Sequence, residues 1–200
     1  MKNYELELPE GYRPYKVIDA KKTSTAIIFN TLSFVLLAIA CGVLFAIKKP
    51  SFEISYDNHS TVGLMIFIYM ASIILYIVGH ELVHGLFYKI FTKQKLTFGL
   101  SLSCAYCGVP QVYLRKWPAI IAALAPFTFF SIIFIPIILL MPANIYCFLL
   151  IILFGIHFGG CIGDLYVSFL MLFILPKDFL VNDNGAKQVF YTKEDQACEN

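Results

Sequence analysis

One run of residues, His80-Glu81-Leu82-Val83-His84, has the types and spacing to bind a metal ion and activate water. On a helix, His80 and His84 project from the same face one turn apart, so both imidazoles can reach one Zn²⁺ ion. Glu81 lies between them, where it can take a proton from water as a general base. We therefore predict a zinc site with His80 and His84 as ligands and Glu81 as the catalytic base. The alternative is that these side chains lie at a helix end near the membrane interface and bind no metal.

A catalytic zinc ion usually has a third protein ligand, and the candidates are Asp164 and His157. On one continuous helix these two would lie roughly 10 Å apart along the axis, so both could not bind the same ion. Counting about 1.5 Å per residue from each expected helix start places His80 and His84 roughly 27 and 33 Å deep. Asp164 lies roughly 30 Å deep and His157 roughly 20 Å deep by the same count. Depth therefore favours Asp164 and leaves His157 as the less favoured ligand.

The elements that must position these residues are apolar helices. The chain has 200 residues, of which 59% are hydrophobic and 14% charged, outside the range of ordinary soluble domains. Of its 13 acidic residues, only Glu81 and Asp164 fall within long apolar segments, where ionisable groups indicate function. The net charge of +2, without a basic run interleaved with aromatic residues, excludes nucleic acid as a partner. We predict an all-α integral membrane fold with four transmembrane helices, at about 25–47, 62–91, 118–140 and 144–175.

The basic residues predict the orientation of these helices. Five Lys or Arg precede the first segment, five lie between the second and third, and three follow the fourth. Only Lys48 and Lys49 lie between the first and second segments, on the opposite side of the membrane. Both termini and the 92–117 loop are therefore expected to be cytoplasmic, at the plasma (inner) membrane. Within that loop, Lys95–Leu102 and Gly108–Leu114 favour strands and predict a small hairpin. The expected divisions are a cytoplasmic N-terminal segment 1–24, a transmembrane domain 25–175 and a cytoplasmic tail 176–200.

Glycines in the fourth segment predict close helix packing. Gly155, Gly159 and Gly163 recur every four residues, a spacing that lets another helix approach closely. Gly79 and Gly85, on either side of the His80–His84 run, are candidates for the complementary surface. We therefore expect the second and fourth segments to pack together.

Several of these motifs resemble a known family. They are His80-Glu81-Leu82-Val83-His84-Gly85 in the second helix, Ala105-Tyr106-Cys107 in the loop, Leu124-Ala125-Pro126 in the third helix, and Gly160-x-x-Gly163-Asp164 in the fourth. They are similar to bacterial multi-pass membrane proteins grouped as zincin peptidases, which are similar in plan to site-2 intramembrane metalloproteases. The resemblance covers roughly residues 60–175. It implies His80, His84 and Asp164 as zinc ligands and Glu81 as the base, although Gly159-Gly160-Cys161 replaces the Asn and Pro of the site-2 protease motif.

The expected function follows from the motif, its setting and this resemblance. We expect a membrane-embedded zinc metallopeptidase that hydrolyses a peptide bond in or next to the membrane. Its cofactor would be Zn²⁺, and its partners the lipid bilayer and a peptide or membrane-protein substrate. The alternative is a non-catalytic membrane protein with a structural metal site, acting as an accessory or partner-binding subunit. A small transporter with Asp164 and His157 as a proton relay is disfavoured, because nothing indicates paired inverted repeats.

Overall fold

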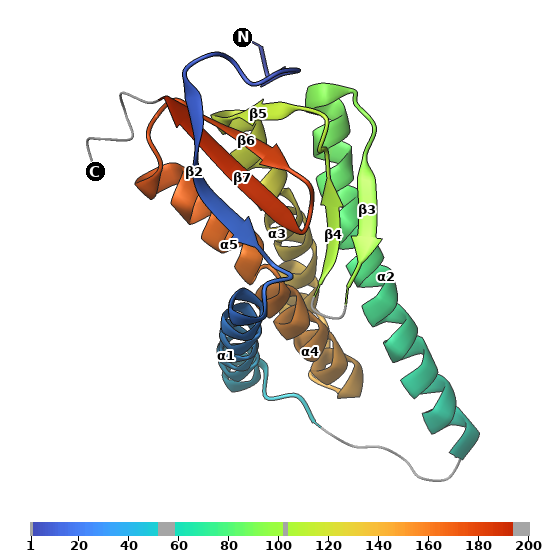
Figure 1. Ribbon diagram of the computed structural model, residues 1–200. Coiled ribbons are helices and arrows are strands. Elements are labelled where there is room, and N and C mark those ends of the chain that lie inside the picture. The colour runs from blue at the N-terminus through green and yellow to red at the C-terminus, as the bar shows by residue number, and fades with distance from the viewer. Residues whose placement is uncertain (1, 52–58, 102–103, 194–200) are drawn as a thin grey trace. The chain divides into compact units, whose positions relative to one another are not determined.

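The computed structural model describes residues 2–51, 59–101 and 104–193, and they belong to two compact units (Figure 1). Each unit is assembled from segments that are distant in sequence, because the boundaries fall within the helices. Unit 1 contains Met1–Asn30, His80–Pro126 and Gly163–Asn200, and unit 2 contains Thr31–Gly79 and Phe127–Ile162.

The expected apolar segments are helices. They are α1 (Thr23–Lys48), α2 (His59–Thr92) and α3 (Lys116–Leu140), followed by α4 (Ile145–Gly160), α5 (Ile162–Phe169) and the π-helical turn η1 (Leu170–Ile174). Within the described ranges, four stretches are long and apolar enough to cross a membrane, the fourth running from Ile145 to Ile174. The length and composition of these helices are thus those of membrane-spanning segments.

The fourth stretch is interrupted, which the sequence does not predict. Asn144 caps its start, because its Oδ1 accepts hydrogen bonds from the backbone N–H groups of Tyr146 and Cys147. At Cys161 the backbone turns to φ −77° and ψ 2°, outside the α-helical range of ψ. Two glycines of low helix propensity precede this residue. A separate helix, α5, therefore begins at Ile162 and carries Asp164 in its first turn.

The all-α expectation is wrong, because unit 1 contains a five-stranded antiparallel sheet (Figure 1). Its order is β1-β5-β6-β7-β2, with bounds β1 (Tyr4–Glu5), β2 (Tyr12–Asp19), β5 (Tyr113–Arg115), β6 (Phe179–Asp183) and β7 (Lys187–Lys193). The longest pairing joins β2 to β7, from Tyr12 opposite Lys193 to Asp19 opposite Lys187. These strands come from the terminal segments and the middle loop. They are stabilised by pairing between distant parts of the chain, and a local sequence pattern does not report such pairing.

The predicted hairpin is present with a different second strand. β3 (Thr97–Leu100) pairs with β4 (Ala105–Gly108), whereas the expected partner stretch, Gly108–Leu114, leads into β5 of the larger sheet. The hairpin rests on α2 at Gly85. A Cβ atom on Gly85 would lie 3.0 Å from Phe98 Cζ and 3.1 Å from Leu96 Cδ1. The hairpin therefore packs directly on the turn of α2 that follows His84.

Unit 1 has one apolar core that joins the sheet to the helices. Buried side chains come from strands β5, β6 and β7, from the end of α2, from the start of α3, and from α5 and η1. They include Leu114, Val181, Phe190, Tyr88, Ile120, Val167 and Met171. The helix ends in this unit are thus held by a sheet that the sequence did not predict.

In unit 2, α1 packs closely on α4 through glycines. A Cβ atom on Gly159 would lie 2.4 Å from the carbonyl oxygen of Ser33, and one on Gly155 would lie 2.4 Å from Cys41 Sγ. Gly79, an expected partner of this glycine run, instead faces Phe130 of α3. The Gly155 and Gly159 positions therefore receive α1 rather than α2. The expected packing of the second and fourth segments is present through other residues, since the Tyr76 hydroxyl of α2 lies 3.1 Å from His157 Nδ1 of α4.

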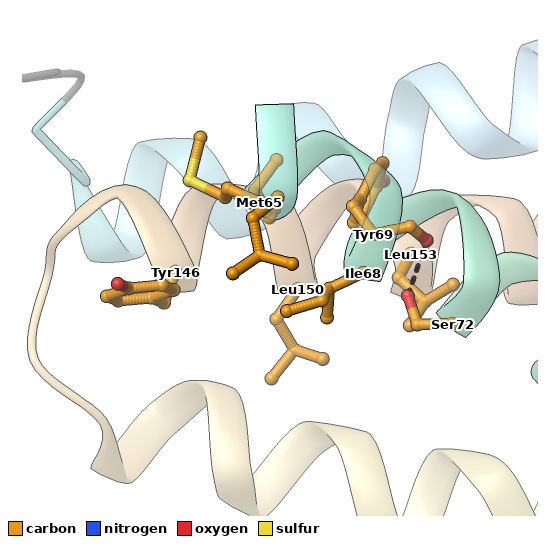
Figure 2. Close-up of a pocket in the computed structure, with 9 residues that line it drawn as sticks. Met65, Ile68, Tyr69, Ser72, Tyr146, Leu150 and Leu153 are labelled. Atoms are coloured by element: carbon orange, nitrogen blue, oxygen red, sulfur yellow. Dashed lines mark hydrogen bonds between the residues drawn. The ribbon is translucent and has the colours of Figure 1, made fainter. Parts of the chain in front are cut away.

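A cavity of about 370 Å³ in unit 2 lies between α2 and α4 (Figure 2). Its wall includes Tyr69 and Ser72 of α2 and Tyr146 of α4, and the Ser72 hydroxyl donates to the Tyr69 carbonyl at 2.7 Å. The described residues that line it include no histidine and no carboxylate, so it is not a candidate for the predicted zinc site. The other lining residues are Leu64, Met65, Ile68, Leu149, Leu150 and Leu153.

Candidate metal centre

The two histidines of the predicted site lie side by side on α2 within unit 1. His80 and His84 are one helical turn apart and both are buried, at 8% and 7% exposure. Their ring centroids are 4.9 Å apart and their planes meet at 74°. The i, i+4 spacing thus produces the pair of imidazoles that the sequence predicts.

Asp164 joins them from α5. Its Oδ2 atom lies 3.2 Å from His80 Nε2 and 3.4 Å from His84 Nε2. The three candidate ligand atoms all lie within 4.8 Å of one another. Asp164 lies in the first turn of α5, two residues after that helix begins at Ile162.

The orientation of the His84 ring is set by a backbone contact. His84 Nδ1 lies 2.8 Å from the carbonyl oxygen of Ala122 on α3. A carbonyl oxygen can only accept, so Nδ1 carries the hydrogen and donates it. In the neutral ring, Nε2 then has the free lone pair, and this is the nitrogen that faces Asp164.

The donor set fits a zinc ion in type and spacing. Tetrahedral ligands at the usual zinc distances of about 2.0–2.1 Å lie about 3.3 Å from one another. The separations of 3.2 and 3.4 Å between Asp164 Oδ2 and the two Nε2 atoms match that value. In addition, Glu81 Oε2 is buried and has no hydrogen-bond partner in the part of the chain that the structure describes. A buried carboxylate oxygen without a partner fits a group that meets water or substrate beside the ligands.

His157, the less favoured third ligand, lies in unit 2. Its Nδ1 is 3.1 Å from the Tyr76 hydroxyl, and its Nε2 is 3.1 Å from the Ser131 hydroxyl. The ring is fully buried, and four phenylalanine rings lie within about 6 Å of it, those of Phe127, Phe130, Phe134 and Phe154. Both ring nitrogens therefore have hydroxyl partners inside unit 2, whereas Asp164 meets the two histidines inside unit 1.

Two groups next to His84 are not evident from the His80–His84 run. The Ala122 carbonyl belongs to the backbone, so no residue type in the sequence could reveal it. Tyr88 does carry a signal, because it follows His84 by the same four residues that separate the two histidines. Its ring lies nearly parallel to that of His84, with an interplanar angle of 19° and a centroid distance of 6.4 Å.

The chain matches one family of known proteins. The family model described as "Putative zincin peptidase" matches residues 72–179, more than half of the chain, and its range contains His80, Glu81, His84 and Asp164. No curated protein matches the chain, and no solved structure matches it either. The similarity to site-2 proteases stays a prediction. The family supports a zinc-dependent, metallopeptidase-type function in general terms. Because this model matches more than half of the chain, the chain belongs to the zincin peptidase family.

Proposed function

We propose that the protein is a membrane-embedded zinc metallopeptidase that hydrolyses a peptide bond in or next to the membrane. The observation that carries the proposal is that Asp164 Oδ2 lies 3.2 and 3.4 Å from the Nε2 atoms of His80 and His84, with all three ligand atoms within 4.8 Å of one another. Glu81 follows the first ligand directly on the same helix. Two imidazoles and one carboxylate leave a fourth position for water or substrate, as catalytic zinc sites require.

The proposed chemistry assigns a role to each of these side chains. A zinc ion bound there would act as a Lewis acid toward the scissile carbonyl and lower the pKa of a coordinated water molecule. His80, His84 and Asp164 hold the metal, and the Ala122 carbonyl keeps the proton of His84 on Nδ1. Glu81 takes a proton from water as general base and delivers it to the leaving amine. Its Oε2 atom has no hydrogen-bond partner among the described residues, so an acceptor is available for that step.

The membrane setting is supported by the surfaces of the helices. Large apolar side chains along them are exposed, among them Leu75 at 73%, Phe67 at 70% and Phe34 at 71%. Large apolar side chains exposed in such number along helices indicate contact with a membrane or another protein. The four helices are long enough to cross a bilayer. We therefore place the protein in the lipid bilayer.

The sheet supports an orientation with both termini on one side. Strands β2 and β7, from the two ends of the chain, pair directly, and β5 of the loop between α2 and α3 belongs to the same sheet. An even number of crossings is the simplest path that lets these segments meet. In unit 2, Lys48 donates to the carbonyls of Leu139 and Met141, which explains one of the two basic residues on the opposite side. With the basic residues counted above, we propose cytoplasmic termini at the plasma (inner) membrane.

The test compares wild type with Glu81→Gln, and Glu10→Gln serves as a matched control because Glu10 is exposed. Each protein is expressed in a host that lacks the native gene, and new N-termini in host membrane proteins are identified by mass spectrometry. Zinc is measured in each purified protein. We expect new N-termini with wild type and Glu10→Gln, none with Glu81→Gln, and equal zinc in all three.

The other outcomes are distinct. Zinc in all three proteins with no dependence of cleavage on Glu81 would support the structural-metal alternative. Wild-type protein without zinc would contradict the metallopeptidase proposal. Labelling of a tag in the 92–117 loop from outside the cell would contradict the proposed orientation.

A further inference from the structure

We infer that Tyr88 and Asp183 form a positioning pair that holds the His84 ring in its metal-binding orientation and ties the metal centre to the five-stranded sheet. The inference rests on the proposed zinc site, but it concerns residues outside the HExxH motif. Neither residue is a ligand. Both would act through His84.

Tyr88 forms one wall beside His84. Its ring lies nearly parallel to the His84 ring, at 19°. Its side chain is buried, at 4% exposure. The Ala122 carbonyl accepts a hydrogen bond from His84 Nδ1, and the Tyr88 ring lies beside the imidazole with the two centroids 6.4 Å apart. A shift of the Tyr88 ring is therefore expected to disturb the packing beside His84.

The hydroxyl of Tyr88 is itself held by the sheet. It donates to Asp183 Oδ2 at 2.5 Å, across 95 residues of sequence. Asp183 is the last residue of β6 and is buried, at 3% exposure. The link therefore runs from the last residue of β6 to the Tyr88 ring, which lies beside the proposed ligand His84.

Asp183 is fixed from several directions. Its carboxylate accepts from Gly185 N at 2.7 Å and from Gln188 Nε2 at 2.9 Å, and its backbone carbonyl accepts from Val109 N at 2.8 Å. Gly108 allows this close approach, since a Cβ atom there would lie 2.9 Å from the Asp183 carbonyl oxygen. Burial raises the pKa of Asp183 to about 6, so at neutral pH the carboxylate is mostly ionised and accepts a hydrogen bond from the Tyr88 hydroxyl.

Groups that orient a metal ligand affect metal affinity without touching the metal. The test variants remove or keep the two atoms of the hydrogen bond between the Tyr88 hydroxyl and Asp183 Oδ2. Tyr88→Phe keeps the ring and removes the hydroxyl, and Asp183→Ala removes the acceptor. Asp183→Asn keeps an acceptor oxygen for Tyr88. Tyr191→Phe is the matched control, because Tyr191 lies in β7 and its ring packs on Tyr113 of the same sheet.

The experiment measures the zinc dissociation constant of each full-length protein in detergent by competition with a chelator. Thermal unfolding is recorded in parallel, and so is the visible spectrum of the Co²⁺-loaded protein. We expect Tyr88→Phe and Asp183→Ala to weaken zinc binding about 10- to 100-fold and to shift the Co²⁺ spectrum. Asp183→Asn and Tyr191→Phe should stay close to wild type in zinc affinity and in the Co²⁺ spectrum. Rescue by Asn separates positioning from a general loss of fold.

Two outcomes would overturn the inference alone: wild-type affinity in folded Tyr88→Phe, or equal losses in Asp183→Asn and Asp183→Ala. Losses in every variant including Tyr191→Phe, in step with lower unfolding temperatures, would also overturn it. If wild type binds no zinc, the proposed metal site and this inference both fail. If the variants behave as expected while cleavage does not depend on Glu81, the inference stands and the peptidase proposal fails.

Discussion

The Oδ2 atom of Asp164 lies 3.2 Å from the Nε2 atom of His80, although 84 residues separate them in sequence. The contact joins α2 to the first turn of α5, just after the backbone departs from the helical range at Cys161. A carboxylate at this distance from two imidazoles can complete a three-ligand zinc set. Its contribution, and that of His157, can be measured separately.

Asp164→Ala is expected to lose most of its bound zinc, because it removes one of three protein ligands and leaves two imidazoles. His157→Gln is expected to keep the zinc content of wild type. It removes a ring whose nitrogens face Tyr76 and Ser131, and it retains a polar side chain. Zinc per folded protein, measured by mass spectrometry of the metal, checks both. Loss of zinc in His157→Gln with retention in Asp164→Ala would reverse the ligand assignment.

Gly85→Val is expected to reduce the free energy of unfolding by about 1–3 kcal/mol more than Gly63→Val does. A Cβ atom at Gly85 meets Phe98 and Leu96 of the hairpin at 3.0 and 3.1 Å, whereas nothing described lies within 4 Å of one at Gly63. Both substitutions are on α2, so the intrinsic effect of valine in a helix cancels. Denaturant unfolding in detergent gives the comparison. Equal effects would show that the hairpin does not press on α2.

Gly159→Ala is expected to lower the free energy of unfolding by about 1–3 kcal/mol, because the new methyl group would lie 2.4 Å from the Ser33 carbonyl oxygen. Gly42→Ala on α1 is the matched control, since nothing described lies within 4 Å of that position. The free energy of unfolding of Gly42→Ala should equal that of wild type or exceed it by up to about 1 kcal/mol, because alanine has a higher helix propensity than glycine. Unfolding in detergent checks both variants. A neutral Gly159→Ala would contradict the close packing of α1 on α4.

Asp183→Asn is expected to be more stable than wild type at pH 7, with a difference that shrinks as the pH falls to 4. Burial raises the pKa of Asp183 in the folded protein from 3.8 to about 6. Between these values the folded state binds a proton that the unfolded state releases, so the wild type gains stability as the pH falls. Two pKa units correspond to about 3 kcal/mol.

The measurement for Asp183→Asn is the free energy of unfolding at several pH values for both proteins. Groups common to both cancel in the difference. A difference that does not vary with pH would contradict a raised pKa at Asp183.

The positions of His80, Glu81 and His84 on one helix could be predicted from the sequence, because helical spacing is local. Four apolar segments were evident for a similar reason, since length and hydropathy are properties of each segment alone. Asp164 was singled out as one of two acidic residues in those segments. The sequence also carried a family resemblance, and the match over residues 72–179 confirms it.

Local sequence patterns could not predict three features of the structure. These are the five-stranded sheet, the interruption at Cys161 and the contacts of His84. The sheet pairs residues from both ends of the chain, such as Tyr12 with Lys193, and neither strand has an apolar pattern that marks it alone. The carbonyl of Ala122 and the carboxylate of Asp183 reach the site through folding at long range. Residue types and helical periodicity thus specify the ligands, and long-range backbone pairing decides which groups orient them.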